Sequence, residues 1–206
     1  MAKFSLDREQ WLTEAAHMIR SDLIIPNLPN GHTIPHPFRV SVGYPPRSTA
    51  RSRTIAVCIK AEASADSHNE IFITPSLADN IKVLEALAHE LVHQADDCQS
   101  GHQHFFAAMA RKIGLEGQLT ATHAGAELVE YLNMIVDSLG DIPHAAINLD
   151  IAKKKQGTRL LKVECKSCGF NFSLSRKQFD RMLTNTCNVC GNMHDHGLHQ
   201  VARNPK

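Results

Sequence analysis

Residues 89–93 read His-Glu-Leu-Val-His, a spacing that suits a metal-dependent hydrolase. On a helix, residues four apart lie on one face, so the imidazoles of His89 and His93 can bind the same ion. Glu90 then lies beside the open coordination position, where it can take a proton from a water molecule. The pattern predicts a zinc hydrolase, with a catalytic Zn²⁺ and Glu90 as the general base.

The segment around this motif has the spacing of a buried helix. With 13 histidines among 206 residues, the motif can also arise by chance on a surface helix that carries two solvated histidines. The apolar residues argue against that alternative, because they recur at helical spacing: Val83, Leu84, Leu87, Ala88, Leu91 and Val92. Unpaired histidines would be costly in such a helix, and a metal ion would satisfy them.

A third protein ligand is expected shortly after the helix, in the stretch Gly101-His-Gln-His. Both His102 and His104 qualify. We prefer His102, because a ligand just before the next helix leaves the apolar residues of that helix free to pack inward, whereas His104 falls inside it. Cys98 is a further candidate, although thiolates are more typical of structural sites.

A second metal motif lies near the C-terminus. Cys165 and Cys168 form one Cys-x-x-Cys pair, and Cys187 and Cys190 form another after 18 intervening residues. A glycine follows each pair, and glycine permits the positive φ that turns backbone N–H groups toward the sulfurs. Two such pairs predict a zinc ribbon that holds a structural Zn²⁺.

Disulfides or a redox dithiol are the alternatives for these cysteines, and disulfides need an oxidising compartment. Nothing in the chain indicates export. The N-terminus lacks the apolar core of a signal peptide, and no stretch is long enough to span a membrane. We therefore expect a cytoplasmic protein without membrane contacts, associated with the nucleoid in a bacterial host.

The remaining pattern predicts an α+β domain of the zincin-like type. Residues 5–20 and 78–95 are expected to be helices, as are 103–113 and 124–139. Three strands are expected between the first two helices, at 38–42, 54–61 and 69–74. In this order a sheet backs the metal helix, and an edge strand can pair with an extended peptide substrate.

Two features of this domain stay open. The Gly-rich segment 114–125 is either a wall of the active-site cleft or an ordinary connection between helices. The group that stabilises the oxyanion cannot be read from the chain, and Tyr131, His123 and His144 are candidates.

We divide the chain into a metalloprotease domain at 1–145, a basic linker at 146–158 and a zinc ribbon at 159–206. The net charge of +1 conceals an asymmetry. Residues 1–150 contain 11 Lys or Arg and 18 Asp or Glu, whereas residues 151–206 contain 11 and 3. The basic C-terminal part is therefore expected to bind a phosphate backbone.

The residues expected to contact nucleic acid share a positive charge and lie on the linker and ribbon: Lys153, Lys154, Lys155, Arg159, Lys162, Lys166, Arg176, Lys177 and Arg181. The alternative is that these charges only solubilise a linker. Phe170, Phe172 and Phe179 interleave with them. We interpret these aromatic residues as the small core of the ribbon rather than as a surface that stacks on bases.

In combination these motifs resemble the SprT-like metalloprotease family, in the form carried by bacteria and their phages. The resemblance rests on residues 89–93, on Gly101-His102 with Phe106, and on the basic linker with its four-cysteine ribbon. It extends to residues 111–117 and 121–128, so it covers most of the chain. It implies that His89, His93 and His102 bind the catalytic zinc and that Glu90 is the base. One position departs from the pattern of the family, because Gln103 stands where the family usually has glycine.

Relatives such as Spartan cleave proteins crosslinked to DNA. The resemblance therefore implies a zinc endopeptidase that is recruited to DNA, single-stranded or damaged, and that cuts DNA-bound proteins. One rival is a nucleic-acid-binding adaptor for transcription or repair, in which the first zinc is structural. Another is a phage protease for one specific protein, with the ribbon as a docking module. Neither the cleavage preference nor the oligomeric state follows from the sequence.

Overall fold

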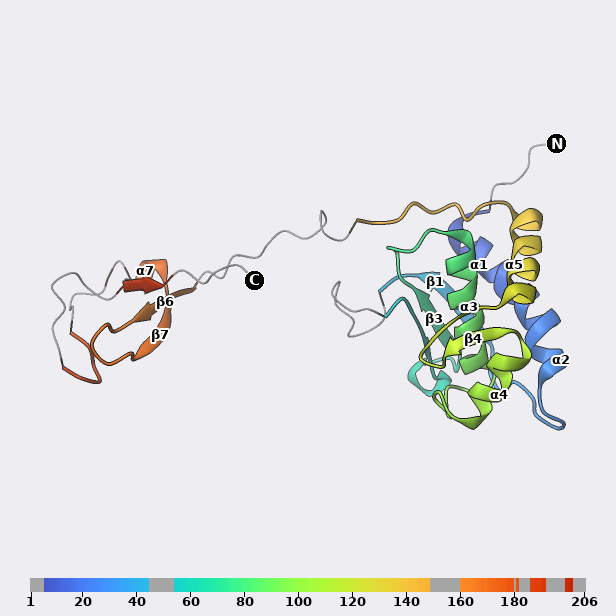
Figure 1. Ribbon diagram of the computed structural model, residues 1–206, viewed down its shortest axis with the longest axis horizontal. Coiled ribbons are helices and arrows are strands. Elements are labelled where there is room, and N and C mark those ends of the chain that lie inside the picture. Colours follow the sequence, from blue (N-terminus) through green and yellow to red (C-terminus); the bar gives the residue numbers. More distant parts are fainter. Residues whose placement is uncertain are drawn as a thin grey trace. The chain divides into compact units, whose positions relative to one another are not determined.

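The computed structural model of the chain describes residues 6–44, 54–148, 160–179, 181, 186–191 and 199–201. The chain forms two compact units, Met1–Ala152 and Lys153–Lys206 (Figure 1). The division between them falls inside the stretch 146–158 that we interpreted as a linker. Helices and short sheets are mixed along the chain, which confirms the α+β class.

The helices of the first unit are α1 (Arg8–Ile19), η1 (Arg20–Ile24), α2 (Ile25–Asn27), η2 (Ala61–Ala63), α3 (Asn80–Gln94), α4 (His104–Lys112) and α5 (Ala126–Leu139). Its strands are β1 (Phe38–Val42), β2 (Ala56–Ile59), β3 (Asn69–Ile73), β4 (Leu115–Gln118) and β5 (Ala121–Ala124). The three strands expected before the metal helix are present, the second shorter at both ends than expected. The helix that carries the histidine motif is also present.

The main sheet has the order β1-β3-β2. β1 runs parallel to β3, with Phe38 opposite Asn69, and β2 runs antiparallel to β3, with Ala56 opposite Ile73. In β3 the side chains alternate between buried and half-buried, as expected for a strand that packs a helix layer against one face. β2 is therefore an edge strand of this sheet.

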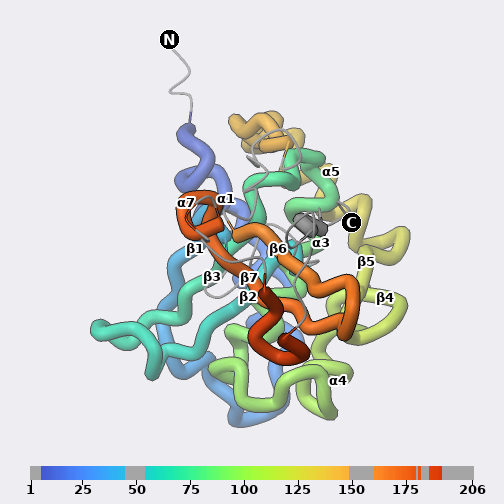
Figure 2. Tube along the Cα trace, turned by 90° about the vertical axis from the view of Figure 1, so that its left-hand side faces the viewer, coloured from blue at the N-terminus to red at the C-terminus, as the bar shows by residue number. Residues whose placement is uncertain are grey.

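Helix α3 runs through the middle of the first unit, between the main sheet and α5 (Figures 1 and 2). It packs against α1, α4, α5 and the strands β2, β3 and β5. Its core-facing residues are fully buried: Val83, Leu84, Leu87, Ala88, Leu91 and Val92. A helix held on so many sides offers a rigid support for the histidine pair.

The N-terminal helical segment is longer than its sequence indicates. Asp7 caps α1 by accepting a hydrogen bond from the Gln10 N–H, and the Gln10 side-chain oxygen accepts one from the Asp7 N–H. We expected the helix to end at residue 20, but η1 continues it as a π-helix and α2 carries it to Asn27. Pro26 lies in the first turn of α2, one residue before the helical segment ends.

The segment 114–125 is a β-hairpin of β4 and β5, with Leu115 opposite Ala124 and Gly117 opposite Thr122. Gly117 has φ +89°, a conformation that L side chains rarely adopt. A Cβ on Gly117 would also come within 2.9 Å of the His123 ring. The glycine therefore both permits this backbone and leaves room for the opposite strand.

The second unit contains β6 (Leu160–Glu164), β7 (Asn171–Ser175), α7 (Arg176–Phe179) and β8 (His199–Val201). β6 lies in the middle of the sheet, antiparallel to both of its neighbours. The core is small. Among the described residues, it buries Val163, Cys165, Leu174 and Cys187, with Phe172, Phe179 and Cys190 packed partly against them.

Among the described helices of both units, none combines the length and the apolar character that crossing a bilayer requires.

Candidate metal centres

Two groups of side chains could hold metal ions, one in each unit. The first is built on α3, where His89 and His93 lie one helical turn apart. The helix begins at a firm cap, since the Asp79 side chain accepts a 2.9 Å hydrogen bond from the Lys82 N–H. Cap and core packing together fix the direction in which both imidazoles leave the helix.

The third histidine, His102, arrives from the turn after α3. That turn passes through Asp97 and Cys98, both in left-handed conformations at φ 55° and 58°. Such conformations are unfavourable for these residues and persist where surrounding contacts impose them. The Asp97 carboxylate supplies such contacts, accepting 2.7 Å hydrogen bonds from the Ala61 N–H and the Asn69 side chain. These hydrogen bonds attach the turn to the sheet, so that the chain brings His102 back to His89 and His93.

The three imidazoles converge through their Nε2 atoms. His102 Nε2 lies 3.2 Å from Nε2 of His89 and 3.2 Å from Nε2 of His93. In a tetrahedral site with metal–nitrogen bonds of about 2.0–2.1 Å, neighbouring nitrogens are about 3.3–3.4 Å apart. The buried ring of Phe106 stacks on His93, with ring centroids 4.4 Å apart, and supports the group from below. The spacing therefore fits three ligands of one ion.

Burial keeps these imidazoles in the form that binds metal. Burial, together with the neighbouring His93 and His102, lowers the pKa of His89 to about 3. Burial and the proximity of His102 lower the pKa of His93 to about 4, and burial also lowers that of His102. All three rings are neutral at pH 7, so each has a lone pair available for an ion.

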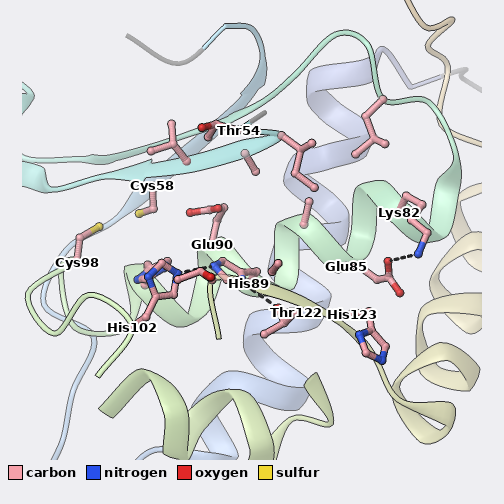
Figure 3. A pocket seen from close by; sticks show the side chains of 18 of the residues that line it. Thr54, Cys58, Lys82, Glu85, His89, Glu90, Cys98, His102, Thr122 and His123 are labelled. Carbon is pink, nitrogen blue, oxygen red and sulfur yellow. Dashed lines mark hydrogen bonds and ion pairs between the residues drawn. The ribbon is translucent and has the colours of Figure 1, made fainter. Parts of the chain in front are cut away.

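Glu90 is buried beside this group, with 6% of its surface exposed. Figure 3 shows its carboxylate on the side of α3 that faces Cys58 of β2. Burial raises the pKa of Glu90 to about 8, although a hydrogen bond from the Cys58 N–H acts in the opposite direction. A cation bound nearby would favour the carboxylate. Glu90 is therefore placed and tuned to exchange a proton near neutral pH.

The histidines and Glu90 open into a cleft of about 750 Å³. Its walls are α3, the start of β2, the loop that carries Cys98 and His102, and the hairpin residues 120–123 (Figure 3). Of the two interpretations of segment 114–125, the cleft wall is the one that the structure supports. The side chain of Cys98 contacts Cys58, and this contact and burial raise the pKa of Cys58. Cys98 thus lies against another thiol rather than in the histidine group.

Two side chains near the histidines, Thr122 and Glu85, make contacts that were not expected from the sequence. Thr122 Oγ1 lies 2.8 Å from Nδ1 of His89. The buried carboxylate of Glu85 accepts hydrogen bonds of 2.9 Å from the Ala124 N–H and 2.9 Å from Lys82 Nζ. A signal for Glu85 was available, because it stands four residues before His89 and therefore on the same helix face. Thr122 lies 33 residues beyond His89, and no spacing rule points to it.

Of the other candidates in this unit, His104 is exposed at the first position of α4 and lies outside the histidine group. The geometry favours His102 as the third ligand. Tyr131 donates a hydrogen bond to Asp22, and His144 contacts the Pro75 carbonyl. Of the three oxyanion candidates only His123 lines the cleft, and Figure 3 places it beyond Thr122, away from His102.

The second group consists of the four cysteines. Sγ of Cys165 lies 3.8 Å from Sγ of Cys190, and Sγ of Cys168 lies 3.7 Å from Sγ of Cys187. A disulfide would require about 2.05 Å. In a tetrahedral site with metal–sulfur bonds of about 2.3 Å, neighbouring sulfurs are about 3.8 Å apart. The observed spacing therefore fits four thiolates around one ion.

Backbone N–H groups point at these sulfurs, as the glycines predicted. Gly169 and Gly191 have φ 74° and 68°. The Val189 N–H lies 3.4 Å from Sγ of Cys187. Hydrogen bonds from the N–H groups of Cys190 and Val189 lower the pKa of Cys187 to about 6. One sulfur of the four is thus readily ionised, and a cation would favour the loss of the remaining protons.

The basic residues are only partly covered by the described structure: Lys153, Lys154, Lys155 and Arg159 lie outside it. The remaining ones are distributed over β6, the first cysteine turn, α7 and the turn residue 181 after it, all exposed except the half-buried Lys162: Lys162, Lys166, Arg176, Lys177 and Arg181.

The aromatic residues of the second unit divide. Phe172 and Phe179 pack against its core, as interpreted from the sequence, whereas Phe170 keeps 39% of its surface exposed.

The structure thus brings together His89, His93 and His102 with Glu90 beside them, and separately the four cysteines. These two groups account for every sequence-predicted metal ligand except the two alternatives for the third position, His104 and Cys98. Comparisons of the chain with protein-family models, with curated proteins and with solved structures found no match.

Proposed function

We propose that this chain is a zinc-dependent endopeptidase with a zincin-like first unit and a zinc ribbon as its second. The observation that carries the proposal is the position of Glu90, a buried carboxylate beside three convergent imidazoles on the wall of an open cleft. A site that only stabilises a fold has no use for such a carboxylate. The likeness of the motifs to the SprT-like family supports the same conclusion.

The donor atoms suit zinc. Neutral imidazole nitrogens and thiolates are the ligands that zinc prefers, and both spacings match its bond lengths. With three protein ligands in the first group, one tetrahedral position is left for a water molecule or a substrate. A bound zinc ion would supply Lewis acidity toward a carbonyl oxygen and toward a water molecule.

In this proposal Glu90 moves the proton. Its carboxylate accepts a proton from the attacking water and then delivers that proton to the leaving amine of the cleaved peptide. Without metal, burial raises the pKa of Glu90 to about 8. The positive charge of a bound ion would lower this pKa toward neutral pH. The Cys58 N–H holds the carboxylate in place from β2.

The edge strand β2 suits an extended polypeptide substrate. Backbone groups of an antiparallel strand point alternately toward the partner strand and away from it. The Ile55 carbonyl accepts a hydrogen bond from the Thr74 N–H, whereas the Cys58 N–H points toward Glu90. Ala56, which shares the orientation of Cys58, therefore directs its backbone N–H and C=O into the cleft. A peptide that pairs there would pass in front of Glu90.

We further propose that the basic second unit recruits the enzyme to DNA. Residues 151–206 carry 11 Lys or Arg against 3 Asp or Glu, while the remainder of the chain is acidic. A protease held on DNA meets DNA-bound or DNA-crosslinked proteins at a raised local concentration, so recruitment selects the substrate without altering the chemistry. The same charge also supports the rival function, a nucleic-acid adaptor in which the first zinc is structural.

The test is to incubate the zinc-loaded full chain with a DNA-binding protein, with and without single-stranded DNA, over a range of salt concentrations. We expect fragments, identified by mass spectrometry, in larger yield with DNA. The gain from DNA should disappear at high salt, because phosphate contacts release counterions. Absence of fragments from a chain that binds two zinc ions and DNA would support the adaptor instead.

A further inference from the structure

One side-chain contact links the β4–β5 hairpin to the histidine group. Thr122 Oγ1 lies 2.8 Å from Nδ1 of His89, while Nε2 of the same ring lies 3.2 Å from Nε2 of His102. A neutral imidazole carries its proton on one nitrogen only. If the proton is on Nδ1 and is donated to the Thr122 oxygen, Nε2 presents its lone pair to the group.

Within the described part of the chain, His89 is the only one of the three histidines whose Nδ1 has a hydrogen-bond partner. Its ring is therefore the one whose tautomer and rotation the protein dictates through a polar contact. The His93 ring is instead held by its stacking on Phe106.

The hairpin is itself anchored to α3 through Glu85. This side chain is 8% exposed, and its carboxylate accepts hydrogen bonds from the Ala124 N–H and from Lys82 Nζ. Burying a carboxylate is costly unless it is paired, and here both oxygens have partners. Ala124 lies two residues after Thr122 on β5, so both side chains point to the same face of the hairpin. Glu85 thus holds the strand where the Thr122 hydroxyl reaches His89.

We propose that Thr122 and Glu85 are positioning residues of the histidine site: Thr122 fixes His89 with its proton on Nδ1, and Glu85 keeps β5 against α3. The inference rests on the proposed function in one respect, since it requires that the three histidines bind a metal ion. Partners of this kind orient a ligand and raise its basicity, and their loss typically weakens metal binding about 10- to 100-fold.

The experiment measures zinc affinity of the full chain by competition with a chelator. Thr122→Val removes the hydroxyl at nearly constant shape. Thr120→Val makes the same change at an exposed position in the turn of the same hairpin, and Thr122→Ser restores a hydroxyl. We expect Thr122→Val to weaken the histidine site about 10-fold or more. Thr120→Val and Thr122→Ser should stay close to wild type. The four-cysteine site of the same chain, unaffected in every variant, is the internal reference.

A second set of variants tests whether Glu85 keeps β5 against α3. Glu85→Ala leaves the Ala124 N–H without its acceptor, so it should weaken zinc binding in the same direction, whereas Glu85→Gln keeps an acceptor and should retain most of the affinity. Because both residues act through one contact, the double variant Glu85→Ala/Thr122→Val should lose less than the sum of the single losses. Fluorescence of Trp11, the single tryptophan, reports whether the first unit remains folded in each variant.

Equal zinc affinity of Thr122→Val and Thr120→Val would overturn the inference while leaving the metal centre intact. A wild-type chain that binds a single zinc ion, with the same content in His93→Ala, would remove the metal centre itself, and the inference with it. A loss confined to Thr122→Val, rescued by serine, supports the positioning role, because a purely structural role of the hairpin would not distinguish these variants.

Discussion

The two candidate metal groups differ in the number of ligands, in what surrounds them and in how much of the fold depends on them. Three imidazoles converge on α3 beside a buried carboxylate and an open cleft, whereas four thiols close on one another with backbone N–H groups around them. The ligand spacings of 3.2 Å and 3.7–3.8 Å fit nitrogen and sulfur around ions of one size. Under the proposed function, this difference suits a metal for chemistry in the first unit and a metal for structure in the second.

The cores of the two units differ in whether they include candidate metal ligands. The first unit buries a continuous cluster of side chains from α1, the main sheet, α3 and α5, and none of its members is a metal ligand. In the second unit, two of the four buried core residues among those described, Cys165 and Cys187, belong to the candidate metal group. We therefore expect the first unit to fold without metal and the second to require it.

The largest expected effect comes from Cys187→Ser. Without the fourth sulfur the second unit loses its metal, and its few buried residues cannot hold β6 and β7 together. Hydrogen exchange followed by mass spectrometry should show loss of amide protection across residues 160–175, with protection of α3 unchanged. Cys58→Ser, a cysteine outside the metal group, is the matched control. Protected β6 and β7 strands in metal-free Cys187→Ser would contradict this account of the second unit.

The next largest effect concerns the first unit and distinguishes His102 from His104 as the third metal ligand. His102→Ala should reduce the zinc content from two ions per chain to one, because it removes a convergent Nε2. His104→Ala should leave both ions bound, since that side chain is exposed at the start of α4. Unfolding followed by Trp11 fluorescence should change little in either variant. The reverse zinc contents would show that the loop binds metal in another arrangement.

The pH dependence of the metal-free first unit gives a smaller effect. The pKa of His89 and His93 falls from an ordinary 6.5 to about 3 and about 4, so the unfolded chain binds more protons below pH 6.5. The free energy of unfolding should fall as pH falls through that window. The pKa of Glu90 rises from 4.5 to about 8, so the folded chain holds this proton more tightly than the unfolded chain. The free energy of unfolding should therefore fall as pH rises toward 8. Stability should therefore peak near about pH 6.5.

Urea titrations of the chelated protein, followed by Trp11 fluorescence, measure this profile without interference from the second unit, which has no tryptophan. Glu90→Gln should remove the decline above pH 6.5 and keep the decline below it. Glu62→Gln, at an exposed position, should follow wild type. A free energy of unfolding that stays constant from pH 4 to pH 8 would mean that burial does not shift the pKa of His89, His93 or Glu90.

The contrast between the two groups also explains what could be predicted from the sequence. Local spacing indicated most of the metal ligands: His89 and His93 lie four apart on a helix, and each cysteine pair has two intervening residues. Burial periodicity indicated α3 and the strands around it. These signals need no knowledge of distant parts of the chain, so they survive in a single sequence.

What the sequence could not supply depends on tertiary contacts. Thr122 reaches His89 only because Gly117 permits the hairpin and Glu85 pins β5 to α3, and four-residue strands in a Gly-rich segment show too little alternation to be recognised. The sequence favoured His102 over His104, but it gave no sign of the left-handed turn at Asp97 and Cys98 that leads to His102, because this turn depends on contacts with Ala61 and Asn69. The π-helical continuation of α1 likewise carries no local signal.

Hydrolysis at the histidine group with Glu90 as the base is tested most directly by the cleavage rate of a protein substrate by Glu90→Gln. We expect a rate about 10²- to 10⁴-fold below wild type, with two zinc ions still bound and Trp11 fluorescence unchanged, while Glu62→Gln cleaves at the wild-type rate. Cleavage by Glu90→Gln at the wild-type rate would contradict the assignment of the base.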